Sequence, residues 1–260
     1  TAMYRSKAGG GNQFHFYAAD MGVQADQHLY IAGALQRALR RDELLLHYQP
    51  QFDSTSGRIV GLEALLRWHP AGGEPIPPAR FMPLAEETGL IVPIDAWVLE
   101  AAMRQQAAWA RMGFGLLRMS INVSAARFHE NLAVQLERLA GLTGCDPATL
   151  TLEITERVLM RHPDAADTMG RLAAMGVRLV IDDFGTGCSN LAALKRFPIH
   201  GLKVDRSFVA EVAKGDGDAI VEALIAFARS MRLDVVAEGV EDDAQRRFLE
   251  ARGCRLMQGY

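Results

Sequence analysis

Short apolar runs alternate with amphipathic stretches along this chain of 260 residues. Apolar runs rich in β-branched residues are typical of buried strands, and apolar residues spaced three or four positions apart are typical of helices. The strands are predicted at Leu44–Gln49, Ile59–Trp68, Leu116–Val123, Leu150–Thr155, Val177–Asp183, Gly201–Asp205, Asp234–Glu238 and Arg255–Tyr260. Helices are predicted between most of them, at Asp95–Met112, Leu132–Leu142, Asp164–Met175, Ser189–Arg196, Asp218–Met231 and Asp242–Arg252.

Strands that alternate with helices in this way predict an α/β fold, a modified (β/α)8 TIM-like barrel. The link between the first two strands, Phe52–Gly57, holds turn residues and no helical pattern. A link without a helix favours a hairpin, because parallel neighbours need a long crossover connection. The first strand is therefore expected to run antiparallel to the second.

The amino-terminal part has a different pattern. Residues 1–24 mix short apolar patches with Gly9–Gly11, which is typical of the end of one module followed by a linker. Asp26–Arg41 has helical spacing and is predicted to be a connecting amphipathic helix. Because the chain starts at Thr1 rather than Met, we expect a piece of a longer protein, with a sensor or membrane anchor upstream.

Composition and charge narrow the function classes. The chain is 49% hydrophobic and 23% charged, which is ordinary for a globular protein with a large core. A formal net charge of −3 argues against a DNA or RNA polymer as the partner, so any phosphate chemistry must be local. The three cysteines form no CxxC pair, and neither a membrane span nor a signal peptide is visible. These features favour the cytoplasm.

The stretch Val177–Gly187 is the strongest candidate for a site. Its apolar strand ends in two adjacent carboxylates, Asp182 and Asp183, and the following Gly185 and Gly187 let the backbone turn. Two neighbouring carboxylates raise each other's pKa unless a cation lies between them, so a divalent metal site is the first hypothesis. A solvated acidic turn is the structural alternative.

Other polar residues follow the remaining strands. In a barrel of this kind the catalytic groups lie at the carboxyl ends of the strands. The polar residues at or near those ends are Gln49, Glu63, Arg67, Asn122, Glu153, Glu156, Asp182, Asp183, Lys203, Asp205, Glu238, Glu241 and Gln258. Their oxygen atoms suit Mg²⁺ or Mn²⁺, and the absence of His and Cys among them argues against zinc. Singly, each also has a structural explanation, such as helix capping by Asn122 or an ion pair between Glu63 and Arg67.

Lys203 is the most informative cation, because a lysine inside a barrel is costly unless carboxylates surround it. Asp205, two residues further on, is its structural partner if the pair is only an ion pair. In the functional interpretation, Lys203 orients or polarises a water held by metal, and two metal ions clamp the oxygens of a phosphodiester. Arg67 would then bind a phosphate in a bidentate manner.

The segment Glu63–Trp68, with the sequence EALLRW, resembles the signature of the EAL-domain family. Members of this family are phosphodiesterases that linearise the bacterial second messenger cyclic di-GMP. The resemblance extends in order through Tyr48–Pro50, Ile121–Ser124, Leu152–Glu156, Asp182–Gly187, Leu202–Asp205, Ala237–Glu241 and Gln258–Tyr260. It therefore covers the chain from about Leu35 to Tyr260.

The resemblance implies a role for each matching residue. The ligands implied for two Mg²⁺ or Mn²⁺ ions are Glu63, Asn122, Glu153 and Asp182 for one, and the bridging Asp182 with Asp183 for the other. The catalytic residues implied are Glu63, Lys203 at the hydrolytic water, Glu238 near the second ion, and Glu156, which would hold the loop after Asp183. The residues implied on the substrate side are Gln49, Leu65, Arg67, Asp205 and Gln258. The family further implies the product pGpG and a homodimer formed around that loop.

The sequence departs from the family pattern in two places. Cys188 and Asn190 stand where the family usually has an aromatic residue and a serine, which affects loop packing and dimer coupling rather than chemistry. The family also continues past Gln258–Tyr260 into a last strand and helix, so we expect either a missing tail or an open barrel.

The segment Thr1–Lys7, with Gly11 and Asn12, resembles the carboxyl-terminal tail of a GGDEF domain. This predicts two parts, a GGDEF-like tail and linker over residues 1–24 and an EAL domain, truncated at its end, over residues 25–260. None of the cyclase residues are present, so no cyclase activity is expected.

The main hypothesis is thus a metal-dependent cyclic di-GMP phosphodiesterase. The alternative is a catalytically silent EAL module that binds cyclic di-GMP as a receptor. A silent receptor typically lacks one or more metal ligands, and here each is present. A barrel acting on a different phosphodiester is a third interpretation.

Overall fold

The computed structural model describes residues 30–114, 117–128, 131–161, 165–186, 194–212 and 218–259. The chain divides into two compact units, one of Thr1–Leu45 with Arg67–Ile91 and the other of Leu46–Leu66 with Val92–Tyr260. The second unit holds most of the barrel strands. The proposed tail and linker over residues 1–24 lie outside the described residues, so that boundary stays a prediction.

The strands form a closed barrel in sequence order. They are β1 (Leu44–Asp53), β2 (Arg58–Trp68), β3 (Arg118–Val123), β4 (Leu150–Thr155), β5 (Arg178–Phe184), β6 (Gly201–Val204), β7 (Asp234–Val240) and β8 (Leu256–Gly259). From β2 to β8 each neighbouring pair is parallel, whereas β1 pairs antiparallel with β8 through Phe52 and Met257. The predicted modified barrel with an antiparallel first strand is confirmed. The expectation of an open barrel is wrong, because β8 closes it.

The turn between β1 and β2 explains the reversed first strand. The side chain of Asp53 accepts hydrogen bonds from the backbone N–H groups of Thr55 (2.8 Å) and Ser56 (2.9 Å), which replaces strand pairing with a local turn. Gly57 then takes a left-handed conformation with φ +67°, which glycine adopts without steric cost. No room remains for a crossover helix, so β2 returns beside β1.

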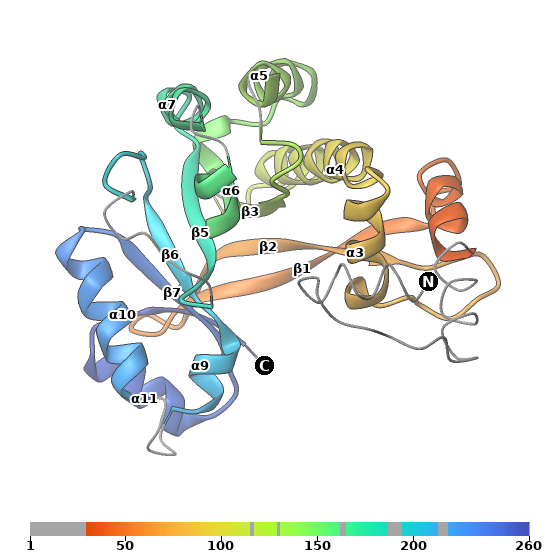
Figure 1. Cartoon of the computed structure of the whole chain (residues 1–260). Coiled ribbons are helices and arrows are strands. Elements are labelled where there is room, and N and C mark those ends of the chain that lie inside the picture. The colour runs from red at the N-terminus through yellow and green to blue at the C-terminus, as the bar shows by residue number, and fades with distance from the viewer. Residues whose placement is uncertain are drawn as a thin grey trace, which may run out of the picture. The chain divides into compact units, whose positions relative to one another are not determined.

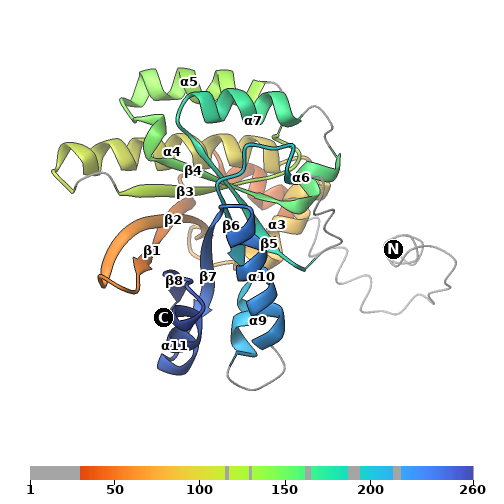
Figure 2. The same cartoon turned by 90° about the vertical axis from the view of Figure 1, so that its left-hand side faces the viewer.

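Helices cover the outside of the strands. Those of the second unit are α4 (Ile91–Arg111), α5 (Asn131–Thr143), α6 (Glu156–Arg161), α7 (Ala165–Ala174), α9 (Arg206–Ala210), α10 (Asp218–Ser230) and α11 (Asp243–Ala251). Figure 1 shows α9, α10 and α11 beside β6 and β7, and Figure 2 shows α5 and α7 side by side. The packing of α9 to α11 buries Val204, Val209, Val221, Ile225, Ala237 and Leu249. Because this core is apolar, it holds the strand ends in fixed positions.

The first unit consists of a helix over residues 30–38, the helix α3 (Pro78–Glu87) and the ends of two strands. Trp68 is fully buried there, packs edge-on against Phe81, and donates from Nε1 to the Glu43 carboxylate at 3.3 Å. The Glu43 carbonyl also accepts from the His69 N–H at 2.8 Å. A buried indole with a hydrogen-bond partner anchors this unit.

Three differences from the sequence predictions concern short elements. The helices α3, α6 and α9 were not predicted, and the predicted helix Ser189–Arg196 falls mostly outside the described residues. The strand β6 ends at Val204, so placing Asp205 on it was wrong. Asp205 instead begins α9, where its side chain accepts from the Ser207 N–H.

Two further observations bear on the cellular setting. Cys145 and Cys254 are free thiols, and both are buried. Within the described ranges, no helix combines the length and the apolarity that crossing a membrane requires.

Candidate active site

Lys203 lies at the centre of the carboxyl ends of the barrel strands. It projects from β6, is only 1% exposed, and its Nζ atom is enclosed by carboxylates from four other strands. The partners and distances are Glu238 at 2.5 Å, Glu153 at 2.6 Å, Glu63 at 3.1 Å and Asp182 at 3.4 Å. The barrel therefore brings Lys203 into contact with Glu63, which is 140 positions away in sequence.

This arrangement decides between the two interpretations of Lys203. Its carboxylate partners come from β2, β4, β5 and β7, whereas Asp205 caps α9. The local ion pair with Asp205 is therefore wrong as an explanation. One ammonium group serves four carboxylates at once, which is an unusual excess of buried negative charge.

Amide side chains complete the environment of Glu63. The Asn122 Nδ2 donates to Glu63 Oε1 at 2.7 Å, and the Gln258 Nε2 donates to Glu63 Oε2 at 2.7 Å and to Gln49 Oε1 at 2.9 Å. Two predicted residues, from β3 and β8, thus contact Glu63 on β2 directly. The predicted Gln49 on β1 is linked to it through Gln258. Each amide orientation is fixed, because its nitrogen faces an oxygen acceptor.

The sequence interpretation missed Gln51. Its Nε2 donates to Gln258 Oε1 at 3.1 Å and so sets which way the Gln258 amide points. The side chain is 9% exposed and lies on β1, two residues after Gln49 and on the same face of the strand. The two-residue spacing from Gln49 could have indicated that Gln51 lies on the same face. An uncharged amide that does not follow a strand end gives no other indication of a role in a site.

The end of β5 holds the second cluster of carboxylates. Oxygen atoms of Asp182, Asp183 and Glu238 lie within 4.8 Å of one another, an arrangement that can hold a metal ion. Asp183 has φ +53°, which is uncommon for a residue other than glycine, and the register of β5 against β6 shifts there. The bulge turns both adjacent carboxylates toward one centre, which a regular strand does not allow.

The loop after Asp183 is held by Glu156. The Glu156 carboxylate accepts from the Gly185 N–H at 3.1 Å, and the Thr186 hydroxyl donates to the Asp183 carbonyl at 2.8 Å. Gly185 has φ +95°, so a side chain there would be strained. These contacts fix the loop directly beside the carboxylates. Cys188 and Asn190 lie outside the described residues.

The pKa values report the excess of negative charge. Burial raises the pKa of Glu153 to about 8 and that of Glu238 to about 7, although Lys203 acts in the opposite direction on both. Burial and the neighbouring Asp182 also raise the pKa of Asp183. Lys203 therefore does not offset the effect of burial and of the neighbouring carboxylates, and a bound cation would favour the ionised forms of these groups.

In Glu63 and Lys203 the charged form is favoured, unlike in Glu153 and Glu238. Burial alone would raise the pKa of Glu63, but Lys203 and the amide donors of Gln258 and Asn122 hold it below its ordinary value. Burial disfavours a charged Lys203, yet the surrounding carboxylates hold its pKa well above the ordinary range. Lys203 thus stays protonated and cannot act as a base near neutral pH.

The remaining predicted residues are placed less directly. Leu65 follows Glu63 by two residues on β2. Arg67 is the penultimate residue of β2 and belongs to the first unit, so its role as a phosphate contact stays a prediction. The backbone N–H of Glu241 donates to Gln245 at the start of α11, which is a structural role. The Asp205 carboxyl raises the pKa of Asp183 and so lies near the cluster.

Comparison with known proteins gives a consistent result. The EAL domain family matches residues 32–260. The "Bifunctional diguanylate cyclase/cyclic di-GMP phosphodiesterase MucR" of Pseudomonas aeruginosa is 44% identical over 263 residues, which are 100% of this chain and 38% of that protein. The "Cyclic di-GMP phosphodiesterase NbdA" of the same organism is 42% identical over 266 residues, which are 100% of this chain and 34% of that protein.

A solved structure described as "PaMucR Phosphodiesterase, c-di-GMP complex" has a TM-score of 0.83 and 44% identity, over 88% of this chain and 94% of that one. The chain thus shares the fold of that structure. It spans little more than a third of the length of the two curated proteins.

Proposed function

Since the chain belongs to the EAL domain family, we propose that it hydrolyses cyclic di-GMP to linear pGpG. The observation that carries this proposal is the buried Lys203 Nζ, enclosed by four carboxylates at the carboxyl ends of the strands. A silent receptor can lose these acidic residues without losing its ligand. Here all of them are present and converge, which favours the enzyme.

The donor set fits divalent cations of the Mg²⁺ or Mn²⁺ type. Every candidate ligand offers oxygen, and burial together with neighbouring carboxylates raises the pKa values of Glu153, Glu238 and Asp183, an effect that a bound cation would oppose. Glu63, Asn122, Glu153 and Asp182 would hold one ion, and Asp182 with Asp183 a second. When bound, the ions supply Lewis-acid stabilisation of the charge that develops on the phosphodiester.

Asn122 fits this assignment in a specific way. Its Nδ2 donates to Glu63, so its carbonyl oxygen is turned away from Glu63 and can serve as a ligand. Asn122 is itself exposed on the solvent side of the cluster. The amide nitrogen thus fixes the orientation that a hard cation requires.

Lys203 acts as a permanently charged donor. Its ammonium group carries three N–H donors and is held from four sides, so it can orient the attacking water and stabilise negative charge without moving. Glu238, whose side chain is 19% exposed, is more open to solvent than Glu63 and Glu153. It therefore holds Lys203 from the side that substrate enters.

Substrate contacts are proposed for residues around this centre. Gln49 accepts from Gln258 through Oε1, which leaves its amide nitrogen available to the dinucleotide. Leu65 and Arg67 would contact a base and a phosphate, and Asp205 and Gln258 would complete the substrate side. Glu156 would keep the loop after Asp183 in its working position.

The setting is proposed from the same family membership. Cytoplasmic location agrees with the free buried thiols of Cys145 and Cys254 and with the absence of a membrane-spanning helix among the described residues. We also propose a homodimer, and a longer protein in which a GGDEF domain or sensor precedes residue 25. The larger size of MucR and NbdA supports an upstream module.

The test is incubation of the protein with cyclic di-GMP and Mg²⁺ or Mn²⁺, beside an EDTA control, with chromatographic separation of the nucleotides. Metal-dependent appearance of pGpG is the expected result. Saturable binding of intact cyclic di-GMP without any product would instead establish the receptor. Hydrolysis of unrelated phosphodiesters at a similar rate would favour the third interpretation.

A further inference from the structure

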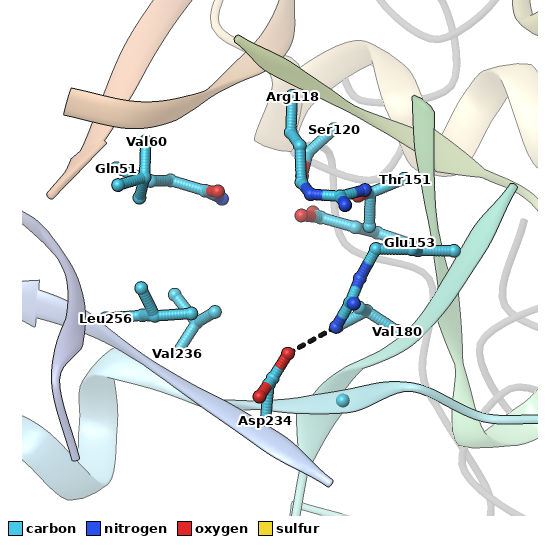
Figure 3. A pocket seen from close by; sticks show the side chains of 12 residues that line it. Gln51, Val60, Arg118, Ser120, Thr151, Glu153, Val180, Asp234, Val236 and Leu256 are labelled. Atoms are coloured by element: carbon cyan, nitrogen blue, oxygen red, sulfur yellow. Dashed lines mark hydrogen bonds and ion pairs between the residues drawn. The ribbon is translucent and has the colours of Figure 1, made fainter. Parts of the chain in front are cut away.

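A cavity lies at the end of the barrel opposite Lys203. It has a volume of about 180 Å³ and is formed where the strands begin. Figure 3 shows its side chains, which come from β1 to β5, β7 and β8. Arg118, Arg178, Asp234 and Leu256 are the first residues of β3, β5, β7 and β8.

The mouth of this cavity carries unbalanced positive charge. Arg178 forms an ion pair with Asp234, whose side chain is 60% exposed. Arg118 donates from Nη1 to the Ala148 carbonyl at 3.2 Å, and among the described residues it has no carboxylate in salt-bridge contact. Burial and then Arg178 lower the pKa of Arg118, and burial, followed by Arg178 and Arg118, lowers the pKa of His200. Two guanidinium groups thus share one exposed carboxylate.

Two hydroxyl groups also line the cavity wall. Ser120 is 3% exposed and Thr151 is 6% exposed, and both side chains line the cavity. Neither hydroxyl oxygen is among the buried side-chain atoms without a partner in the described residues. A hydroxyl that lines a cavity can donate a hydrogen bond to a molecule inside it.

Apolar side chains also line the cavity. In Figure 3, Val236 and Leu256 lie together, and Val60 lies beside Gln51, across the cavity from them. The cavity therefore offers hydrocarbon as well as charged groups and hydroxyl donors. A cavity with both kinds of lining suits an amphiphilic occupant.

We propose that this cavity is a binding site for a small organic anion, a carboxylate that carries a short hydrocarbon body. The carboxylate lies toward Arg118 and Arg178 and accepts from the hydroxyls of Ser120 and Thr151, since guanidinium and hydroxyl donors match its oxygens. The hydrocarbon lies against Val60, Val236 and Leu256. This site is separate from the proposed phosphodiesterase activity and does not depend on it.

The sign of the ligand charge is the critical point, because Glu153 also lines the inner end of the cavity. The Glu153 carboxylate is already engaged at 2.6 Å by the Lys203 ammonium. A cationic ligand would therefore have to compete with Lys203 and would also meet both arginines. An anion avoids both conflicts.

The experiment is an NMR titration of the isotope-labelled protein without nucleotide, using three probes. Butyrate is the expected ligand. Butylammonium has a similar hydrocarbon chain with the opposite charge, and inorganic phosphate has negative charge without a hydrocarbon chain. We expect saturable shifts for butyrate at the amides of Arg118, Thr151 and Arg178, and none at Asp183. The expected dissociation constant is on the order of 1–10 mM for so small a ligand.

Three variants and one control locate the site. Arg118→Gln and Arg178→Gln each remove a charge, and Thr151→Val removes a hydroxyl at nearly constant shape. We expect the arginine variants to weaken butyrate binding at least tenfold and Thr151→Val to weaken it about threefold, as loss of a charged and a neutral hydrogen bond implies. Arg247→Gln removes an exposed arginine of α11 and should change nothing.

Several results would overturn the proposal. These are no saturable butyrate shift, binding of butylammonium at least as tight as butyrate, and equal affinity for phosphate, which would show that the apolar side chains play no part. Unchanged butyrate affinity in both arginine variants would also place the ligand elsewhere. Thermal unfolding of each variant, compared with the parent, shows that lost binding does not reflect lost structure.

Discussion

Lys203 is the residue on which both the stability and the proposed chemistry of the site depend most. An isolated buried lysine would lose its proton, but four carboxylates hold it charged, and it cannot leave without exposing them to one another. The same residue therefore connects stability with chemistry. The effect of Lys203 on stability and its effect on catalysis can be measured separately. A bound metal ion would compensate for the lost positive charge but would not restore a donor at the position of the ammonium group.

Lys203→Ala is expected to lower kcat by more than it weakens substrate binding, because the ammonium is proposed to act on the attacking water rather than on the dinucleotide. It should also lower the unfolding temperature more in EDTA than in Mg²⁺, since the proposed cation would offset the unpaired carboxylates. Steady-state kinetics and thermal unfolding measure the two effects. Damage confined to KM would contradict this role, and Lys195→Ala is the exposed control.

Glu63→Ala and Asp182→Asn each remove one carboxylate from the proposed metal set. Turnover is expected to fall at least about 100-fold, as for the loss of a group that stabilises transition-state charge. Asp182→Asn keeps the shape, so circular dichroism should show an intact fold. Asp243→Asn, on the exposed side of α11, is the matched control. A near-normal rate in either site variant would remove the metal assignment.

The raised pKa values predict a pH effect in the metal-free protein. Folding raises the pKa of Glu238 to about 7 and that of Glu153 to about 8, above the value of roughly 4.3 in an unfolded chain. Each group binds its proton more tightly when folded, so stability is highest at low pH and falls as the pH rises through the folded pKa. The depressed Glu63 contributes a constant amount in this window, because it is ionised in both states.

Since a divalent cation favours the ionised carboxylates, its stabilising effect should grow as the pH rises. The gap in unfolding temperature between Mg²⁺ and EDTA samples is expected to be larger at about pH 8 than at about pH 6. An equal gap at both values would show that these groups do not hold the ion.

At the scale of elements, Gly239 determines how closely β7 approaches α9. A Cβ at Gly239 would lie 2.6 Å from the Cβ of Arg206, and φ is +67°. Gly57 has the same φ of +67° with nothing within 4 Å, so it isolates the backbone effect. Gly57→Ala is expected to cost about 1 kcal/mol, and Gly239→Ala about 1–3 kcal/mol more. Chemical denaturation measures both, and equal costs would contradict the close approach.

The sequence predicted the strands well because their apolar β-branched runs are long and clear. Their bounds shifted by only a few residues, as for β5, predicted at Val177–Asp183 and observed at Arg178–Phe184. The short helices α6 and α9 were missed because they are too short to show a helical period. The helix α3 was missed because Pro77, Pro78 and Pro83 resemble a loop.

Charged residues at strand ends were identified from the sequence as candidate site residues. Residues whose contacts depend on the packing of the barrel were missed. Glu63, Glu153, Asp182 and Glu238 do meet Lys203. The contact of Gln51 with Gln258 needs the closed barrel to be seen. The cavity that Ser120 and Thr151 line is likewise invisible in sequence, because its lining comes from several strands that meet only in the closed barrel.

At the scale of the whole molecule, the barrel separates two kinds of charge. The carboxyl ends of its strands gather an excess of buried carboxylates around Lys203, and the amino ends gather Arg118 and Arg178. The first end is suited to cations and a phosphodiester, and the second to a small anion. Gln51 and Glu153 line the cavity at the amino ends of the strands, and they also contact Gln258 and Lys203 at the carboxyl ends. These two side chains therefore connect the two ends of the barrel.

The most direct test of the central claim is mass spectrometry of the nucleotide after reaction with cyclic di-GMP and Mn²⁺ in ¹⁸O-labelled water. We expect linear pGpG that carries one heavy oxygen in its terminal phosphate, and no product in EDTA, because the site directs water to the phosphodiester. Recovery of bound but intact cyclic di-GMP in the presence of metal would contradict the account.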